Sequence, residues 1–216
     1  MKTGLRLGLF GPPGAGKGTQ AERLAVAMGF AHISTGDMFR SMQTSDSELA
    51  RHIREIIDGG RLVPDELVTQ MTLDRLSQPD AACGFILDGF PRTLVQAIAL
   101  QDSPKALDAL IEIRVPREEI ISRLSGRRVC ESCRAIYHVR DLARDSDACQ
   151  ACGGKLTQRD DDRPEAIAIR LNVFESNFAP LVKFYRDRGL LLSIDGYGDP
   201  QVVFERLLQG LRQIKS

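Results

Sequence analysis

Short apolar runs alternate with helical patterns along most of the chain. The runs, each short enough for a buried strand, are Leu5–Phe10, Ala31–Ile33, Phe85–Leu87, Leu110–Val115 and Leu190–Ile194. Apolar residues spaced by three or four positions predict helices between them, first at Ala21, Leu24, Ala25 and Met28, then around 64–76, 93–101, 116–126 and 165–186, and finally at Val203, Leu207, Leu211 and Ile214. Pro180 should end or kink the helix that contains it. Strands that alternate with helices predict an α/β fold, a parallel sheet with helices on both faces.

Two segments interrupt the alternation. Residues 34–63 predict helices without an apolar strand; Ser34–Asp37 is typical of a helix start, and Asp58–Gly60 of a hinge. Residues 127–163 contain only five Val, Ile or Leu residues and no Phe or Met. So small an apolar inventory cannot stabilise a subdomain against chain entropy, so another interaction must do so. We therefore expect one core domain, built from residues 1–33, 64–126 and 164–216, with inserts at 34–63 and 127–163.

The composition is that of an ordinary soluble globular protein, with 43% hydrophobic and 27% charged residues among 216. The 29 Lys and Arg balance the 29 Asp and Glu, and a formal net charge of zero argues against a protein whose main role is to grip a nucleic-acid backbone. No apolar run approaches the roughly 20 residues that span a bilayer. Arg6 interrupts the apolar stretch at the N-terminus, which disfavours a signal peptide. We expect a cytoplasmic protein that does not associate with membranes.

A glycine-rich segment, Gly11–Thr19, follows the first predicted strand and opens the first predicted helix. Glycines let backbone N–H groups turn inward around a phosphate, and the helix N-terminus adds partial positive charge. Lys17 would reach the transferred phosphate, and the Thr19 hydroxyl could serve phosphate or Mg²⁺. Gly18 stands where the general pattern has Ser or Thr. The lysine and the strand–loop–helix context together predict a phosphate-binding P-loop.

Four of the five cysteines predict a metal site. Cys130-x2-Cys133 and Cys149-x2-Cys152, separated by fifteen residues, have the spacing of a four-thiolate zinc site. Four thiolates leave no open coordination position, so the metal would be structural and would supply the stability that 127–163 lacks. Fe or Co could occupy the same thiolates, and disulfide pairing is the rival interpretation. Cys83 stands in an apolar stretch and is expected to be buried.

Further motifs indicate which kind of phosphate-binding protein carries this loop. Gly-x-Pro-Gly-x-Gly-Lys-Gly-Thr is the form that nucleoside monophosphate kinases carry, and Ser34–Arg40 and Leu87–Arg92 look like motifs of the same enzymes in the same order. With the insert at 127–163 and its flanking arginines, nearly the whole chain resembles the adenylate kinase family, of the type with a long zinc-bearing lid. The resemblance implies an enzyme of adenine nucleotide homeostasis that reversibly transfers phosphate from ATP to AMP with Mg²⁺, giving two ADP. Nothing in the sequence demands more than a monomer. Residues 34–63 would bind AMP, and 127–163 would be the lid.

The resemblance also assigns site residues. ATP would contact Gly14, Ala15, Gly16, Lys17, Gly18, Thr19, Arg123, Arg127, Ile136 and Tyr137. AMP would contact Thr35, Arg40, Arg61, Leu62, Val63, Gly89, Phe90, Pro91, Arg92, Gln96, Arg159 and Arg170. The catalytic set would be Lys17, Arg92, Arg127, Arg159 and Arg170. The turn at 195–200 departs from the family, with an extra residue and no lysine before Pro200, so one adenine contact stays open.

The chemistry of transfer between two nucleotides agrees with these roles. It gathers negative charge, and arginine forks bind phosphate oxygens in pairs without losing their own charge. A phosphate acceptor is already ionised at neutral pH and needs no general base, and the three histidines lie in no catalytic context. Asp88, at the end of an apolar run, would hold Mg²⁺ through water, and the competing interpretation is a cap of the following turn. Asp160–Asp162 is a solvated charge run by default, although the resemblance implies a part in lid closure.

Other functions stay open at this point. A kinase of another monophosphate, UMP or CMP, would share the fold, although Thr35 and the long lid favour AMP. A zinc-ribbon nucleic-acid binder fused to an ATPase is disfavoured by the zero net charge and because Tyr137 is the only residue of the insert that could stack on a base. A P-loop switch that binds nucleotide without transferring phosphate would leave the Phe90-Pro91-Arg92 motif unexplained.

Overall fold

The central sheet contains the five predicted strands. A computed structural model describes residues 4–43, 45–48, 50–53, 63–142 and 147–214. The strands are β1 (Arg6–Phe10), β2 (Ala31–Ser34), β3 (Phe85–Asp88), β4 (Ala109–Arg114) and β8 (Leu191–Asp195). Their order is β2-β3-β1-β4-β8, and every neighbouring pair is parallel. The predicted strands are confirmed to within one residue at each end, and so is the parallel α/β fold.

The predicted helices are also present. They are α1 (Lys17–Met28), α2 (Thr35–Gln43), α4 (Asp65–Leu76), α5 (Leu94–Gln101), α6 (Arg117–Ser125), α7 (Pro164–Asp187) and α8 (Pro200–Ile214), with short 3₁₀ turns η1 (Pro79–Ala81), η2 (Val139–Asp141) and η3 (Asp160–Asp162). The expected start of α2 is confirmed, because the Ser34 hydroxyl accepts a hydrogen bond from the Asp37 amide at 3.2 Å. Among the helices of the described ranges, none has the length and apolar content needed to cross a bilayer.

One local prediction was wrong, and another was wrong in one of its two alternatives. Of the end or kink predicted at Pro180, the end does not occur, because α7 continues to Asp187. The turns beyond Pro180 bury Leu181 and Tyr185 in the core, and that burial outweighs the one backbone hydrogen bond that proline cannot make. Cys83 is exposed rather than buried, because it lies in the turn after η1, ahead of the first residue of β3.

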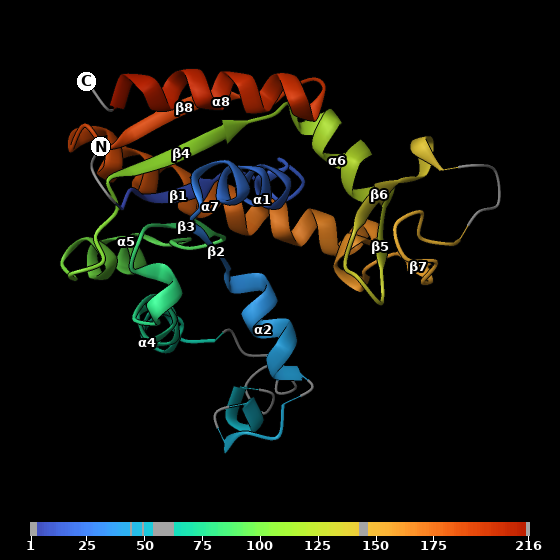
Figure 1. The fold of residues 1–216 in the computed structure, drawn as a ribbon, viewed down its shortest axis with the longest axis horizontal. Coiled ribbons are helices and arrows are strands. Elements are labelled where there is room, and N and C mark those ends of the chain that lie inside the picture. The colour runs from blue at the N-terminus through green and yellow to red at the C-terminus, as the bar shows by residue number, and fades with distance from the viewer. Residues whose placement is uncertain (1–3, 44, 49, 54–62, 143–146, 215–216) are drawn as a thin grey trace.

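The sheet is buried on both faces, as parallel sheets are. Side chains alternate along each strand, so that Leu7 and Leu9 of β1 face one core, with α1 and α8, while Phe10 faces the other. The second core is built by α4, α5 and α7 together with Phe85 and Leu87 of β3. Figure 1 shows α8 along one side of the sheet and α4 and α5 on the opposite side. Burial on both faces fixes the strands, and their carboxyl ends form a rigid edge.

A second, smaller sheet lies apart from the first, beyond α6 (Figure 1). It contains β5 (Arg127–Cys130), β6 (Ile136–His138) and β7 (Leu156–Thr157) in the antiparallel order β6-β5-β7. Its buried core consists of Cys130, Cys149 and Leu156. The scarcity of apolar residues in 127–163 predicts that an interaction other than apolar burial stabilises this segment. The small core, in which two of three residues are cysteines, agrees with that prediction. The strands themselves were not predicted.

Candidate active site

The predicted phosphate-binding loop joins β1, which ends at Phe10, to α1, which begins at Lys17. Gly14 and Gly16 have φ angles of 82° and 89°, in the left-handed region that favours glycine. A Cβ on Gly14 would lie 2.9 Å from Leu124 Cγ, so the loop also packs tightly against α6. Gly16 is the N-cap of α1, and none of the described side chains caps this helix. The first amides of α1 are therefore left for an anion.

The Lys17 ammonium folds back over this loop. Its Nζ donates hydrogen bonds to the carbonyl oxygens of Gly11 and Pro12, both at 2.9 Å. Burial lowers the pKa of Lys17 from 10.5 to about 8, against the opposing effect of the Asp88 charge, and three nearby positive charges lower it further: Arg92, Arg170 and Arg127. A lysine that holds its proton weakly among other cations is suited to receive a polyanion, which would restore its charge.

Asp88 ends β3 directly beside the loop. A Cβ on Gly18 would lie 3.3 Å from Asp88 Oδ2, so any side chain at this position would lie tightly against that carboxylate. His32 Nε2 lies 3.9 Å from the same carboxylate. Within the described residues no hydrogen bond to the Asp88 side-chain oxygens is recorded, so the turn-capping interpretation finds no support. The carboxylate is available to water or to a hydrated cation.

Thr35 and Arg92 meet at one backbone carbonyl. Thr35 Oγ1 donates to the oxygen of Gly89 at 3.0 Å, and Arg92 Nε donates to the same oxygen at 2.6 Å. Gly89 has a φ of 83°, and a Cβ there would lie 2.9 Å from both Thr35 Oγ1 and Arg92 Nη2. The Phe90-Pro91 peptide that follows is cis, and both side chains are buried. The ends of β2 and β3 therefore form one polar corner from the residues assigned to the acceptor.

Gln96 is buried, with 4% of its surface exposed. Its Oε1 accepts from the Arg92 amide at 2.8 Å, and its Nε2 donates to Asp65 Oδ1 at 2.7 Å. Asp65 Oδ2 in turn accepts from the Thr93 hydroxyl at 2.7 Å. The carboxamide is therefore held at both ends, in one orientation. Sequence reasoning missed Asp65, because an aspartate in the first turn of a helix ordinarily signals only the helix dipole.

Asp162 forms ion pairs with two of the predicted catalytic arginines, Arg127 and Arg170. Its carboxylate is fully buried and accepts two bonds from Arg127, from Nε to Oδ2 at 2.7 Å and from Nη2 to Oδ1 at 2.6 Å. Arg170 Nη1 donates to the same Oδ1 at 3.1 Å. The default interpretation of Asp160–Asp162 as a solvated run is therefore wrong for Asp162, because η3 turns this side chain inward. A bidentate, buried carboxylate is the strongest partner that a guanidinium finds in a protein.

Arg159 and Arg40 lie close to this pair. Burial lowers the pKa of Arg159, and the charges of Arg127 and Arg40 lower it further. Arg40 itself is paired with Asp37, with 2.6 Å between Nη2 and Oδ1. Loss of surrounding water also lowers the pKa of Arg92, and Arg170 and Arg40 are among the charges acting on it. The structure therefore brings together all five residues predicted to be catalytic, Lys17, Arg92, Arg127, Arg159 and Arg170.

The remaining predicted contacts lie elsewhere. Arg123 Nε donates to Glu119 Oε1 at 2.7 Å, and its Nη2 donates to the carbonyl of Gly196 at 3.2 Å, in the turn that departs from the family pattern. Ile136 on β6 is 46% exposed. Val63 immediately precedes Pro64, the N-cap of α4. Arg61, Leu62 and the expected hinge at 58–60 lie outside the described residues.

The four paired cysteines converge. Their sulfur atoms all lie within 4.8 Å of one another, and Cys130–Cys152 and Cys133–Cys149 are each separated by 3.5 Å. All four are free thiols, so the rival disulfide pairing is not formed. A tetrahedral site with zinc–sulfur bonds of about 2.3 Å needs sulfurs about 3.8 Å apart, which these positions fit. The Tyr137 hydroxyl donates to Cys149 Sγ at 3.3 Å, and this bond lowers the pKa of the Cys149 thiol to about 6. The cluster is thus able to hold a metal ion.

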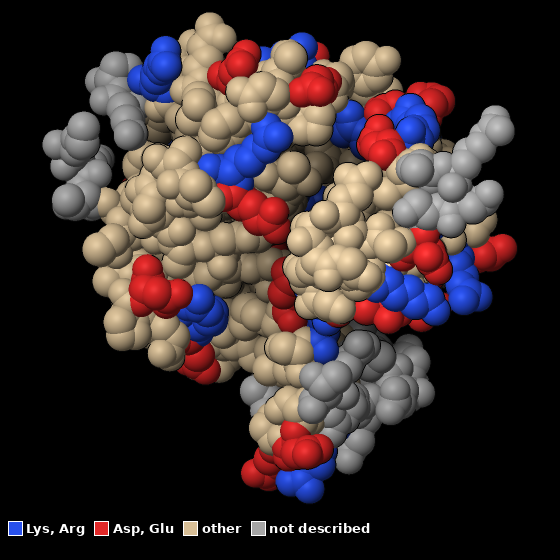
Figure 2. Space-filling model, turned by 45° about the vertical axis from the view of Figure 1, so that its right-hand side comes forward, with Lys and Arg blue, Asp and Glu red and all other residues tan. Residues whose placement is uncertain are grey.

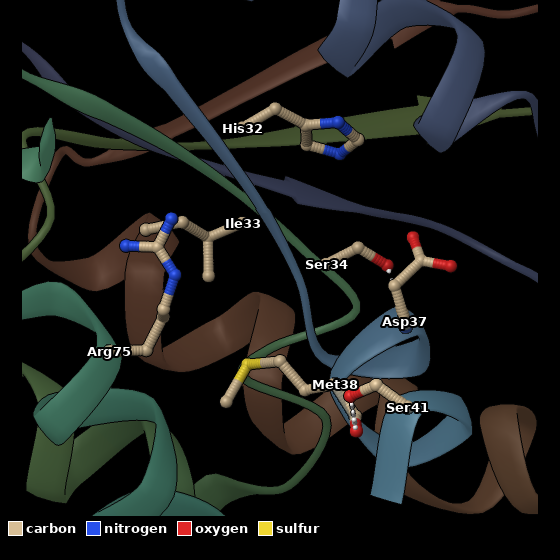
Figure 3. Close-up of a pocket in the computed structure, with 7 residues that line it drawn as sticks. All are labelled: His32, Ile33, Ser34, Asp37, Met38, Ser41 and Arg75. Carbon is tan, nitrogen blue, oxygen red and sulfur yellow. Dashed lines mark hydrogen bonds between the residues drawn. The ribbon is translucent and has the colours of Figure 1, made fainter. Parts of the chain in front are cut away.

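A cavity of about 310 Å³ lies beside the acceptor corner (Figure 3). It is lined by His32, Ile33, Ser34, Asp37, Met38, Ser41 and Arg75. Figure 3 shows side chains from β2, α2 and α4 around it. The Arg75 guanidinium is already held by Asp80 at 2.8 and 2.7 Å. None of the described residues assigned to a nucleotide lines this cavity, but two of its lining residues adjoin the site above, His32 beside Asp88 and Asp37 paired with Arg40.

The sequence was also compared with known proteins, and the matches cover most of the chain. The family described as "Adenylate kinase" matches residues 9–190 of the chain. Proteins named adenylate kinase are 48% identical in Carboxydothermus hydrogenoformans, over 97% of this chain and 100% of that protein, and 45% identical in Archaeoglobus fulgidus, over 98% and 100%. Another, from Symbiobacterium thermophilum, is 50% identical over 87% of this chain and 89% of its own length.

Replacing Asp162 should separate structural from surface roles in the acidic run. In Asp162→Asn, Arg127 and Arg170 lose a buried counter-charge, and we expect the free energy of unfolding in urea to fall by about 2–3 kcal/mol. Asp160→Asn is the matched control, because Asp160 is exposed and, among the described residues, its carboxylate pairs only with Arg163 at the surface. Equal stability of the two variants would show that Asp162 does not organise the arginines.

The low pKa of Lys17 predicts a proton linked to anion binding. Above pH 8 the free protein loses the ammonium charge, whereas a bound polyphosphate raises the pKa and restores it, so the affinity for inorganic triphosphate should fall by up to about tenfold per pH unit. Calorimetry at pH 9 in two buffers of different ionisation enthalpy should detect proton uptake by the wild type and none by Lys17→Met. Binding without proton uptake would contradict the assignment of this pKa to the site.

Proposed function

The chain belongs to the adenylate kinase family, and from that premise we propose that it reversibly transfers the terminal phosphoryl group of ATP to AMP, with Mg²⁺, to give two ADP. One observation carries the proposal. Positive charges from five separate segments, those of Arg40, Arg92, Arg127, Arg159 and Arg170, lie close enough to affect the pKa values of Lys17, Arg92 or Arg159. They lie beside the N-terminus of α1, which no described side chain caps. Two phosphate chains placed end to end present the amount of negative charge that such a cluster needs.

The donor side would be built from the loop and the small sheet. Backbone amides of Gly14–Thr19 would surround the ATP phosphates, with Lys17 at the group in transit and Arg127 beside it. The base would lie near Arg123, whose link to Gly196 positions it against the 195–200 turn. Ile136 and Tyr137 would contribute from β6.

The acceptor side would be built from the polar corner. Thr35, Arg40, the segment Gly89–Arg92 and Gln96 would hold AMP, together with Arg61–Val63. The Gln96 carboxamide is oriented by Asp65 and by the Arg92 amide, and a fixed donor–acceptor pair is what reading a base edge requires. Arg159 and Arg170 would contact both substrates, because they lie between the two sides.

The transfer itself needs positioning more than proton movement. An oxygen of the AMP phosphate forms a bond to the terminal phosphorus of ATP while the bond from that phosphorus to the bridging oxygen breaks, and ADP remains. Since the acceptor oxygen is already ionised, no base is required, and the arginines stabilise the charge that spreads over the transferred group. Asp88, whose carboxylate accepts no hydrogen bond from the described residues and lies beside Gly18, would hold Mg²⁺ through water, and Mg²⁺ would supply further charge neutralisation.

We further propose the division of labour in the chain. The core comprises 1–33, 64–126 and 164–216, residues 34–63 bind AMP, and 127–163 form a lid held by a structural zinc ion on the four cysteines. A lid that closes as one body would exclude water and prevent hydrolysis of ATP. The protein would act as a cytoplasmic monomer. On the face in Figure 2 acidic and basic side chains are interspersed, which does not favour a nucleic-acid partner.

The acceptor is tested by chromatography of products. With ATP and Mg²⁺, AMP should yield ADP far more readily than GMP, CMP or UMP, and Lys17→Met should lose about 100–1,000-fold in kcat because the transferred charge loses a fixed cation. Lys183→Met, which alters an exposed lysine of α7, is the control. Preference for UMP or CMP would overturn the acceptor assignment, and no transfer to any monophosphate would overturn the function.

The metal is tested by elemental analysis and thiol titration. Protein purified under reducing conditions should hold one zinc ion per chain, and Cys130→Ser should lose the ion and melt at a lower temperature, because four-thiolate coordination is what stabilises the small sheet. Cys83→Ser is the matched control, since Cys83 is exposed and outside the cluster. Metal-free protein with two disulfides would support the rival pairing instead.

A further inference from the structure

We propose that the Tyr137 hydroxyl is a positioning residue of the lid metal site, and that through it the metal holds strand β6 in place. The inference rests on the proposed zinc site. Tyr137 lies on β6, whereas its partners Cys149 and Ala151 lie in the second cysteine knuckle. The side chain therefore bridges two parts of the lid that are twelve or more residues apart in the sequence.

The direction of the hydrogen bonds follows from the chemistry of the groups. The Ala151 amide can only donate, and it does so to Tyr137 Oη at 3.2 Å. The hydroxyl hydrogen is then free to point at Cys149 Sγ, 3.3 Å away. A metal-bound thiolate has no proton and can only accept. Each of the three groups is satisfied in this one arrangement, which places a hydrogen-bond donor on a metal ligand.

The two buried ligands of the cluster differ in this respect. Cys130 Sγ accepts from a backbone amide of its own knuckle, that of Cys133, at 3.5 Å. Cys149 is also buried, and besides the backbone of Ala151 and Cys152 in its own knuckle it has a side-chain donor from another element, the Tyr137 hydroxyl of β6. Outer donors of this kind orient a ligand and moderate its charge, and their removal typically weakens metal retention by about 10–100-fold.

The bond also explains how a strand with little apolar support is fixed. Ile136 is 46% exposed, and β5 is the one described strand of the small sheet with which β6 pairs. The ring of Tyr137 packs on the buried cluster of Cys130, Cys149 and Leu156, while its hydroxyl attaches β6 to the opposite knuckle. The bound metal would then be linked to β6 through the Cys149 thiolate and the Tyr137 hydroxyl.

Tyr137→Phe tests the proposal, because it keeps the ring and removes only the hydroxyl. Wild type, Tyr137→Phe and the control Tyr197→Phe, whose tyrosine is 56% exposed, are loaded with zinc, and release to a chromophoric chelator is timed. We expect release from Tyr137→Phe to be about 10–100 times faster than from the other two proteins. Equal release rates from all three loaded proteins would overturn the inference while leaving the zinc site intact.

Cobalt supplies a readout that a general loss of stability would not move. In the Co²⁺-loaded protein, loss of a hydrogen bond to Cys149 raises the energy of the sulfur electrons, so the thiolate-to-cobalt absorption band should shift to longer wavelength in Tyr137→Phe alone. An unchanged band would overturn the inference, as would a raised KM for ATP with no change in release rate or band. Failure of the wild type to bind either metal would overturn the zinc site, and this inference with it.

Discussion

A group of positive charges must be held close together before any phosphate arrives to neutralise them, and the rest of the site depends on how this is done. Arg127 and Arg170 share one buried carboxylate, Asp162, which offsets part of their repulsion and fixes their geometry. The repulsion that Lys17 experiences from the arginines is reduced in another way: its pKa is lowered, and its ammonium donates hydrogen bonds to two loop carbonyls. A substrate phosphate would therefore find cations that are preorganised and only partly compensated.

The parallel sheet supplies the rigid frame for this arrangement. Because β1 and β3 point the same way and lie side by side, the loop after Phe10 and the corner after Asp88 emerge at one edge. Apolar cores on both faces keep that edge from shifting. The arginines of the small sheet and of the segment before α7 then approach from outside it, which suits groups that must admit substrates and afterwards enclose them.

Local sequence patterns predicted the features that lie within one helix, strand or loop. They did not predict the features that depend on contacts between such elements. The loop at Gly11–Thr19, the position of Asp88 and the spacing of the cysteines are each written in a short stretch of chain, and the structure places them as expected. Nothing in the sequence of the run Asp160–Asp162 distinguishes the buried third residue from the exposed Asp160 or the half-buried Asp161, because its burial follows from where η3 meets β5. The contacts of Asp65 with Gln96 and of Tyr137 with Cys149 were not predicted for the same reason, because each joins residues that are distant in the sequence.

The insert at 127–163, our proposed lid, indicates how a metal could replace an apolar core and still serve the chemistry. Strand β5 begins at Arg127 and ends at Cys130, so one short extended segment, about 10 Å long, carries the guanidinium that pairs with Asp162 at one end and a member of the cysteine cluster at the other. Any freedom in the cysteine knuckles would pass along this segment to the arginine and weaken its pairing with Asp162. Four thiolates on one ion would remove that freedom with only a few residues, which a core of Leu and Val could not do in so small an insert. Strand β5 therefore connects the proposed metal site directly to the arginine cluster.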